Sequence, residues 1–347
     1  MTMNSGSAPS RIDWADYAKG LCIIAVVTMY STVYAEGELQ QQGWMHYFVD
    51  FAAPFRMPDF FLLSGLFVPR VMNRPWRTYL DTKVLHFMYF YTLWTAIKCL
   101  FENVHLHSEM DAAAMLSDYF HLYIQPSGPL WFIFMLALFF IAARLLKPVP
   151  VPIIFLAAVA LNLIHLETDW KMINKFGMYF IFFYSGHIFA PSIFRLAGWA
   201  QKNIEMTLAI LAVWFAANLV VVWSGLMSIV VIALLTGFAG ALAVILFSVT
   251  LMYRSWMNWV RYLGANSIVV YLGFFIPMVL LLKLITTYKL ISDVGTISFQ
   301  LSLSSIAVAV LMFWLLRLTP LRFLYSRPEW ARLRQIRSTE KSSAVKS

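Results

Sequence analysis

Apolar stretches of about twenty residues recur along this chain and restrict what it can fold into. A helix that crosses the bilayer core needs about 20 consecutive apolar residues. Ten such spans are expected, near residues 17–35, 47–69, 80–101, 129–146, 149–166, 173–193, 206–223, 227–251, 263–286 and 296–317. The chain is 61% hydrophobic and 12% charged, whereas a soluble domain carries about 25% charged residues. The sequence therefore predicts an all-α, polytopic membrane bundle of about ten transmembrane helices.

The chain divides into three predicted parts. Residues 1–16 form an N-terminal segment, residues 17–322 a transmembrane domain, and residues 323–347 a basic tail that begins as a short interfacial helix. The first residues, MTMNSGSAPS, lack the charged start, apolar centre and cleavage site of a signal peptide. Cys22 and Cys99 lie in apolar segments and are too few for a disulfide framework or a cysteine-based zinc site.

Lysine and arginine are distributed unevenly between the two sides that ten alternating spans define. One side holds 20 of the 26, and eight of these lie from Arg317 onward. The positive-inside rule then places both termini in the cytoplasm. The net charge of +9 therefore reflects topology and contact with anionic membrane lipid, and we expect no nucleic-acid partner.

A histidine cluster lies in the expected outer loop from Glu102 to Gly128. This loop carries His105, His107 and His121 and no lysine or arginine. The spacing of the first two suits a strand more than a helix, and no nearby cysteine completes a familiar zinc site. We expect a solvated loop without a metal; metal binding is the alternative.

The second span contains two ionisable residues in the segment FRMPDFFLLSG. An ionisable residue at the bilayer centre costs roughly 2.5–3.5 kcal/mol on insertion scales, so it usually faces a partner or a polar cavity. Arg56 and Asp59 are three residues apart, share a helix face and are expected to neutralise each other. We interpret the pair as part of a functional cavity lined by the first three spans. An internal ion pair that only packs helices is the alternative.

Other polar groups can be placed by depth, because a helix rises 1.5 Å per residue. Tyr30 lies ~10 Å and Arg56 ~14 Å from the outer face, so the two fall at similar depth. Lys19 lies near the cytoplasmic edge, where it can meet an anionic group. The remaining polar residues within spans lie on the cytoplasmic side, and each has a structural hydrogen bond as its alternative role: His86, His187, Asn266 and Ser267.

Four sequence stretches, in this order, carry a family resemblance. They are RIDWADYAKGLCIIAVV (11–27), FRMPDFFLLSGLF (55–67), GPLWFIFML (128–136) and YLGANSIVVYL (262–272). Together with the expected spans they resemble the acyltransferase 3 family of integral-membrane acyltransferases. The resemblance extends from Arg11 to about Arg322.

The resemblance implies a membrane-bound O-acyltransferase. Family members typically move an acyl group from a cytoplasmic donor such as acetyl-CoA to a carbohydrate or another hydroxyl acceptor, often at the cell surface. It thus implies O-acetylation, polysaccharide modification, a location in a bacterial inner (plasma) membrane, and acyl-CoA as donor substrate without a bound cofactor. Lys19 matches the basic residue of the first motif. Together with Arg74 and Arg77 it is expected to bind the donor's phosphates.

This chain departs from the family at two positions. Where many members end the motif of the ninth span with a histidine after Tyr-Leu, the chain reads YLGFF, Tyr271 to Phe275. Eleven residues after the basic residue of the first motif, where the family usually has a histidine that acts as acid or base, the chain has Tyr30. A tyrosine is a poor base at pH 7 unless a cation assists it. In one interpretation Tyr30 acts with Arg56 and Asp59, of which Asp59 is the better base. In a second, the proton transfer passes to His86 or His187. In a third, catalysis is lost and the protein binds or transports a ligand.

Overall fold

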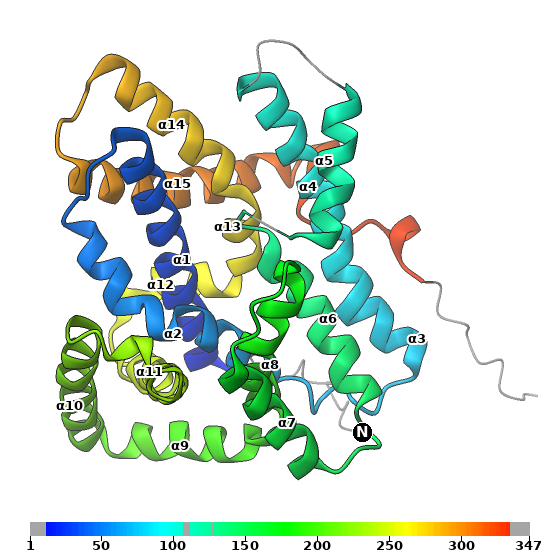
Figure 1. Ribbon diagram of the computed structural model, residues 1–347, viewed down its shortest axis with the longest axis vertical. Helices are drawn as coiled ribbons and strands as arrows, with labels where there is room; N and C mark the ends of the chain where they lie inside the picture. The colour runs from blue at the N-terminus through cyan, green and yellow to red at the C-terminus, as the bar shows by residue number, and fades with distance from the viewer. Residues whose placement is uncertain (1–11, 107–111, 127, 334–347) are drawn as a thin grey trace, which may run out of the picture.

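The computed structural model describes residues 12–106, 112–126 and 128–333, and within these ranges the chain is helical and contains no strand (Figure 1). The longer helices are α1 (Asp13–Leu39), α2 (Met45–Gly65), α4 (His86–Leu106), α5 (Ala112–Ile124), α6 (Trp131–Leu145), α7 (Val151–Ile164), α8 (Lys171–Ile188), α9 (Ala190–Lys202), α10 (Ile204–Trp223), α11 (Val230–Leu251), α14 (Phe275–Tyr288) and α15 (Val294–Leu316). The shorter elements are α3 (Trp76–Tyr79), the π-helix η1 (Leu80–Leu85), α12 (Asn258–Ala265), α13 (Ser267–Gly273) and the 3₁₀ turns η2 (Leu226–Ser228), η3 (Ser255–Met257), η4 (Pro320–Leu324) and η5 (Glu329–Ala331).

Helix α10 shows that the surface of the bundle suits lipid. Its two buried residues are polar, Thr207 and Asn218, and many of its apolar side chains are exposed, among them Met206, Val213 and Val220. The side-chain amide of Asn218 donates a hydrogen bond to the carbonyl oxygen of Phe51 at 3.0 Å. Such a helix satisfies its own backbone and presents hydrocarbon outside, as a membrane-spanning helix must.

Length and composition support fewer spans than the ten expected. Of the described helices, five are long and apolar enough to cross a membrane: α1, the continuous stretch Trp76–Val104, α10, α11 and α15. Two bent pairs, α8 with α9 (72°) and α13 with α14 (46°), raise the number to seven if each pair is one span. Each of the ten expected ranges overlaps a helix, but α6 and α7 are short and α2 contains three charged residues. The structure therefore confirms an all-α membrane bundle and leaves the count of about ten unconfirmed.

Two expectations about connecting segments are wrong. The range expected as an outer loop contains α5, which carries His121, and Tyr91 donates from its hydroxyl to the Leu122 carbonyl at 2.5 Å. The start of the tail docks on the bundle as two 3₁₀ turns in place of an interfacial helix, and Tyr325 packs between Trp94 and Phe313.

The structure describes the side chains of only some of the histidines in the expected outer loop. His107 and residues 1–11 and 334–347 lie outside the described residues, and the side chain of His105 is not among those described. Within the described ranges, no group of three His, Cys, Asp or Glu side chains is placed to hold a metal ion.

Glycines bring α1 close to α12, and α2 close to α8. A Cβ atom at Gly264 would lie 1.6 Å from the backbone oxygen of Asp16, and one at Gly20 would lie 2.1 Å from that of Val260. Gly65 and Gly186 make the same kind of contact between α2 and α8. Small residues at such crossings let helix backbones approach closely in membranes, and these two crossings fix the walls of the candidate site.

Candidate active site

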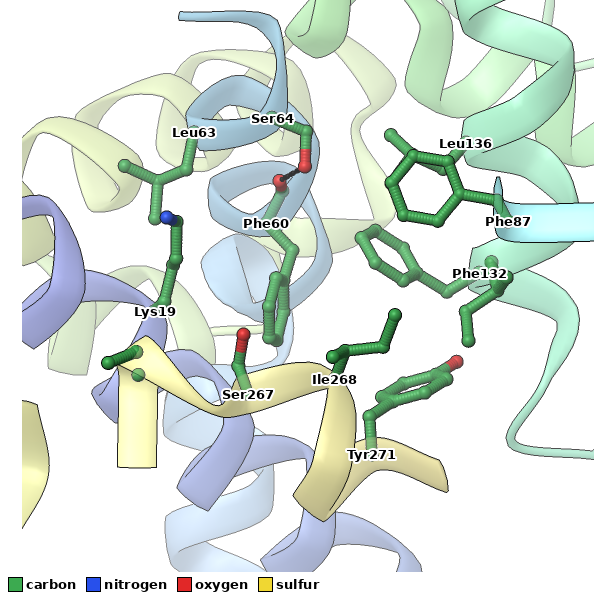
Figure 2. Close-up of a pocket in the computed structure, with 13 residues that line it drawn as sticks. Lys19, Phe60, Leu63, Ser64, Phe87, Phe132, Leu136, Ser267, Ile268 and Tyr271 are labelled. Atoms are coloured by element: carbon green, nitrogen blue, oxygen red, sulfur yellow. Dashed lines mark hydrogen bonds between the residues drawn. The ribbon is translucent and has the colours of Figure 1, made fainter. Parts of the chain in front are cut away.

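A cavity of about 200 Å³, here called the inner pocket, lies between α1, α2, α4, α6 and the α12–α13 corner (Figure 2). Lys19 lies at one side of it and Tyr271 at the other; Phe60, Ser267 and Ile268 lie between them, and Phe87 and Phe132 lie on the right of the view, above Tyr271 (Figure 2). The hydroxyl of Ser64 donates to the Phe60 carbonyl oxygen at 2.8 Å. The first three expected spans contribute to this cavity, but α6 and α13 complete it and it is largely apolar. Arg56 and Asp59, which were expected to line a polar cavity between these three spans, are not among its lining residues.

Basic residues gather beside the Lys19 side of the inner pocket. Lys19 Nζ lies 3.6 Å from Asp16 Oδ1 and 5.1 Å from the centroid of the Phe67 ring. The charges of Lys19 and Arg74 both act on Lys83, which belongs to η1. Arg74 is exposed, as is Arg77 in α3. We call Lys19, Arg74, Arg77 and Lys83 the basic cluster.

Tyr30 lies in a second group of polar side chains, here called the outer cluster, with Arg56 and Tyr179. The Tyr30 hydroxyl donates to the Gly128 carbonyl oxygen at 3.1 Å. The charge of Arg56 acts on both tyrosines, so Tyr30 and Arg56 are neighbours, as their depths predict. Phe274 connects this cluster to the inner pocket, because its ring centroid lies 5.7 Å from that of Tyr30 and 6.5 Å from that of Tyr271.

The expected ion pair between Arg56 and Asp59 is absent among the described residues. Arg56 turns towards the outer cluster, where it donates to the Val49 carbonyl oxygen at 3.5 Å and leaves Nε without a hydrogen-bond partner. Asp59 is fully buried, and its Oδ2 accepts a hydrogen bond from the thiol of Cys22, while Oδ1 has no partner. A spacing of three residues puts two side chains on one face, but here Cys22 of α1 and Val49 of α2 itself provide other partners for them.

Cys22, Arg56 and Asp59 line a larger cavity of about 500 Å³, here called the lateral groove, between α1, α2, α10 and α11. Its other walls are apolar, among them Phe55, Trp214 and Phe247. Sequence reasoning did not assign Cys22 a role. Its position three residues after Lys19, hence on the same face of α1, is the signal that would have pointed to it.

The two candidate histidines lie elsewhere. His86 lines a polar cavity of about 610 Å³ formed with Asp81 and the tail residues Arg327 and Arg332. The ring of His187 lies 5.8 Å from that of Tyr184, and its Nδ1 has no hydrogen-bond partner. Neither residue lines the inner pocket or the lateral groove. The structure thus brings Tyr30 together with Arg56, and places Lys19 and Arg74 each near Lys83, but it brings neither histidine to these groups.

Fold and site together define an integral membrane protein whose helices enclose a small pocket beside a basic cluster. A family model described as an acyltransferase domain matches residues 12–317, and the chain belongs to the acyltransferase 3 family. This confirms the resemblance carried by the four sequence stretches and makes the chain a member of a family of membrane acyltransferases.

A curated relative agrees with this membership. The chain is 25% identical over 187 residues to the inner membrane protein YcfT of Escherichia coli strain K12. The aligned region covers 47% of this chain and 52% of that protein. The chain thus spans about half the length of the curated relative it matches. No solved structure matches it.

Proposed function

We propose that the protein transfers an acyl group, acetyl being the simplest, from acyl-CoA to a hydroxyl of a cell-surface carbohydrate or a similar acceptor. Membership of the acyltransferase 3 family supports this proposal. The relative YcfT is an inner membrane protein, which supports a bacterial inner membrane as the location. The basic cluster and the charge distribution support cytoplasmic termini.

The observation that carries the proposal is the inner pocket between the basic cluster and the outer cluster. Phosphates of a nucleotide-containing donor suit the exposed arginines Arg74 and Arg77. The thioester end of the donor suits a narrow, largely apolar cavity that begins at Lys19 and ends at Tyr271. Tyr271 contacts Phe274, which also contacts Tyr30. Donor and acceptor would therefore approach one another from opposite sides.

Two side chains of α2 supply chemistry in this proposal. Arg56 carries an unpartnered Nε and would stabilise the oxyanion that develops when a hydroxyl attacks the acyl carbon. Asp59 would take the hydroxyl proton as general base, since one of its oxygens has no hydrogen-bond partner. Direct transfer requires the acceptor, the thioester and this base to converge.

The test uses purified protein in lipid nanodiscs with labelled acetyl-CoA and a panel of glycans. We expect wild type to consume acetyl-CoA, and the double variant Arg74→Ala/Arg77→Ala to raise KM for acetyl-CoA at least about tenfold, which corresponds to ~1.4 kcal/mol. Arg254→Ala, which removes an exposed arginine after α11, is the matched control and should leave KM unchanged. Failure of wild type to consume acetyl-CoA would contradict the proposal, and unchanged turnover in Asp59→Asn would remove Asp59 as the base.

One observation favours a second candidate, a protein that keeps the fold for binding or transport without catalysis. The Tyr30 hydroxyl, at the position of the family histidine, is already engaged with the Gly128 carbonyl oxygen. In this case wild type transfers nothing, Tyr30→His gains activity, and proteoliposomes take up solute without acyl-CoA.

A further inference from the structure

The inner end of the lateral groove holds a buried thiol and a buried carboxyl in direct contact. Cys22 is 3% exposed and Asp59 is 0% exposed, and the Cys22 thiol donates its hydrogen bond to Asp59 Oδ2. Both residues line the groove, and Asp59 Oδ1 has no partner among the described residues. A nucleophile in hydrogen-bond contact with a base is the arrangement that covalent acyl transfer requires.

Depth along α1 favours Cys22 over Tyr30 as the first group that a cytoplasmic thioester meets. Lys19 lines the inner pocket, and Cys22 follows it by three residues, or ~4.5 Å along the helix axis. Tyr30 follows Lys19 by eleven residues, or ~16.5 Å. The charge of Lys19 also acts on Cys22, in line with their spacing of three residues on α1.

The lateral groove is a separate cavity that reaches Cys22 and Asp59. It extends along α2 from Phe48 to Asp59, a distance of ~16 Å. Phe215 of α10 and Phe247 of α11 line it and are well exposed on the outside of the bundle. A hydroxyl carried by a membrane-borne molecule could therefore reach Asp59 without passing through the inner pocket.

We propose that Cys22 is a catalytic nucleophile that accepts the acyl group from acyl-CoA and holds it as a thioester, with Asp59 as its base. This inference rests on the acyl transfer proposed above and adds a covalent intermediate to it. The role goes beyond direct transfer, because it divides one reaction between two substrates that need not be present together.

Both steps balance without a further reagent. In the first, Asp59 takes the proton of the Cys22 thiol, and the sulfur bonds to the acyl carbon. The bond from that carbon to the CoA sulfur breaks, and the CoA thiolate takes the proton from Asp59. In the second step Asp59 takes the proton of the acceptor hydroxyl, and the hydroxyl oxygen bonds to the acyl carbon. The bond to Cys22 breaks, and its thiolate recovers the proton from Asp59.

The experiment mixes the full-length protein in nanodiscs with isotopically labelled acetyl-CoA alone, quenches it rapidly in acid and maps the label by mass spectrometry. We expect an acetyl group on the peptide that contains Cys22, released by neutral hydroxylamine as thioesters are. We also expect a burst of about one CoA per protein, the kinetic sign of an acyl-enzyme. Cys22→Ser and Asp59→Asn should lose the label and the burst. Cys99→Ser is the matched control, because Cys99 is the other buried cysteine and lines neither cavity.

The outcomes separate this inference from the function on which it rests. The nucleophile is overturned if wild type turns over with no label on Cys22 and Cys22→Ser turns over within about twofold of wild type. Direct transfer then remains in place. Neither turnover nor label in wild type overturns both proposals. If Cys22→Ser does not fold, judged by gel filtration and thermal melting, the position of the label in wild type still decides the matter.

Discussion

The inner pocket and the lateral groove contact successive stretches of α2, Phe60 to Ser64 and Phe48 to Asp59, and are built in different ways. The inner pocket is held closed on one side where Gly264 of α12 packs against the backbone of α1. The tail packs against η1, which lies beside the inner pocket. The groove is closed on one side by α10, of which only Thr207 and Asn218 are buried. The first cavity is therefore small and firmly walled, whereas the second can widen when lipid-facing helices move. The inner pocket is thus suited to one chemical group of fixed shape, and the lateral groove to groups of varied shape.

The largest expected effect comes from the tail that supports the inner pocket. Arg327 pairs with the carboxylate of Asp81 and also donates to its backbone carbonyl oxygen at 2.6 Å, and the two side chains are 5% and 17% exposed. Removing one partner of such a buried pair costs about 3–5 kcal/mol. Arg327→Ala should therefore lower the melting temperature in detergent and weaken acetyl-CoA binding. Arg332→Ala, an exposed neighbour, is the control; equal effects in both variants would contradict the structural role of the buried pair.

The glycine crossing is the next test, because it should damage the inner pocket and spare the groove. Gly264→Ala places a Cβ 1.6 Å from the backbone oxygen of Asp16, so α1 and α12 must separate. Overpacking of this kind costs about 1–3 kcal/mol, measured by thermal melting. Gly198→Ala provides the matched control, since nothing lies within 4 Å of its added Cβ in α9. An unchanged melting temperature for Gly264→Ala would mean that the crossing is loose.

Filling the inner pocket tests directly whether the donor uses it. Ser267→Trp puts an indole into a cavity of about 200 Å³, and acetyl-CoA consumption should fall at least about tenfold, or ~1.4 kcal/mol. Ser224→Trp, at an exposed position after α10, introduces the same side chain away from both cavities. If Ser267→Trp consumes acetyl-CoA at the wild-type rate, the donor enters by another route and the inner pocket is not its site.

The smallest effect is a pH dependence far from both cavities. Asp293 caps α15, and its hydrogen bonds from the Thr296 hydroxyl and backbone N–H, both 2.6 Å, lower its pKa. A carboxyl whose pKa is lower in the folded state than in the unfolded state stabilises the folded protein at pH values above its unfolded pKa, about 3.9. This stabilisation is lost as the pH falls through the folded pKa. The melting temperature of wild type should thus exceed that of Asp293→Ala by a constant amount at pH 5–7, and the difference should shrink below about pH 4. A difference that persists unchanged to pH 3 would contradict this origin.

The sequence predicted what depends on depth along a helix and missed what depends on contacts between helices. The proximity of Tyr30 and Arg56 follows from helix rise alone, and the structure has it. The spacing of Arg56 and Asp59 also predicted an ion pair between them. In the structure Asp59 instead accepts a hydrogen bond from Cys22 of α1, and Arg56 donates one to the carbonyl oxygen of Val49, earlier on α2. No local pattern shows which neighbour a side chain will meet.

Two further misses have the same cause. The range of α5 carries acidic residues and histidines, which favours a solvated loop, but the helix is stabilised by contacts such as the hydrogen bond from Tyr91 to Leu122. The basic, polar composition of the tail favours a short interfacial helix, yet Tyr325 and Arg327 are buried in the bundle. Overall hydropathy identified a membrane bundle, but it does not report how short or bent helices such as α6, α7 and α9 share the membrane.

The charges of α2 also affect how the protein is made. A segment with Asp50, Arg56 and Asp59 inserts poorly alone, at roughly 2.5–3.5 kcal/mol for each charge near the bilayer centre. Its main packing partner α8 begins at Lys171, more than a hundred residues after α2 ends at Gly65. At a synthesis rate of about 5–20 residues per second, α2 waits several seconds for that partner. During this interval α1 is already synthesised, and its Cys22 thiol can lower the cost of inserting Asp59 by donating to it the hydrogen bond seen in the folded protein.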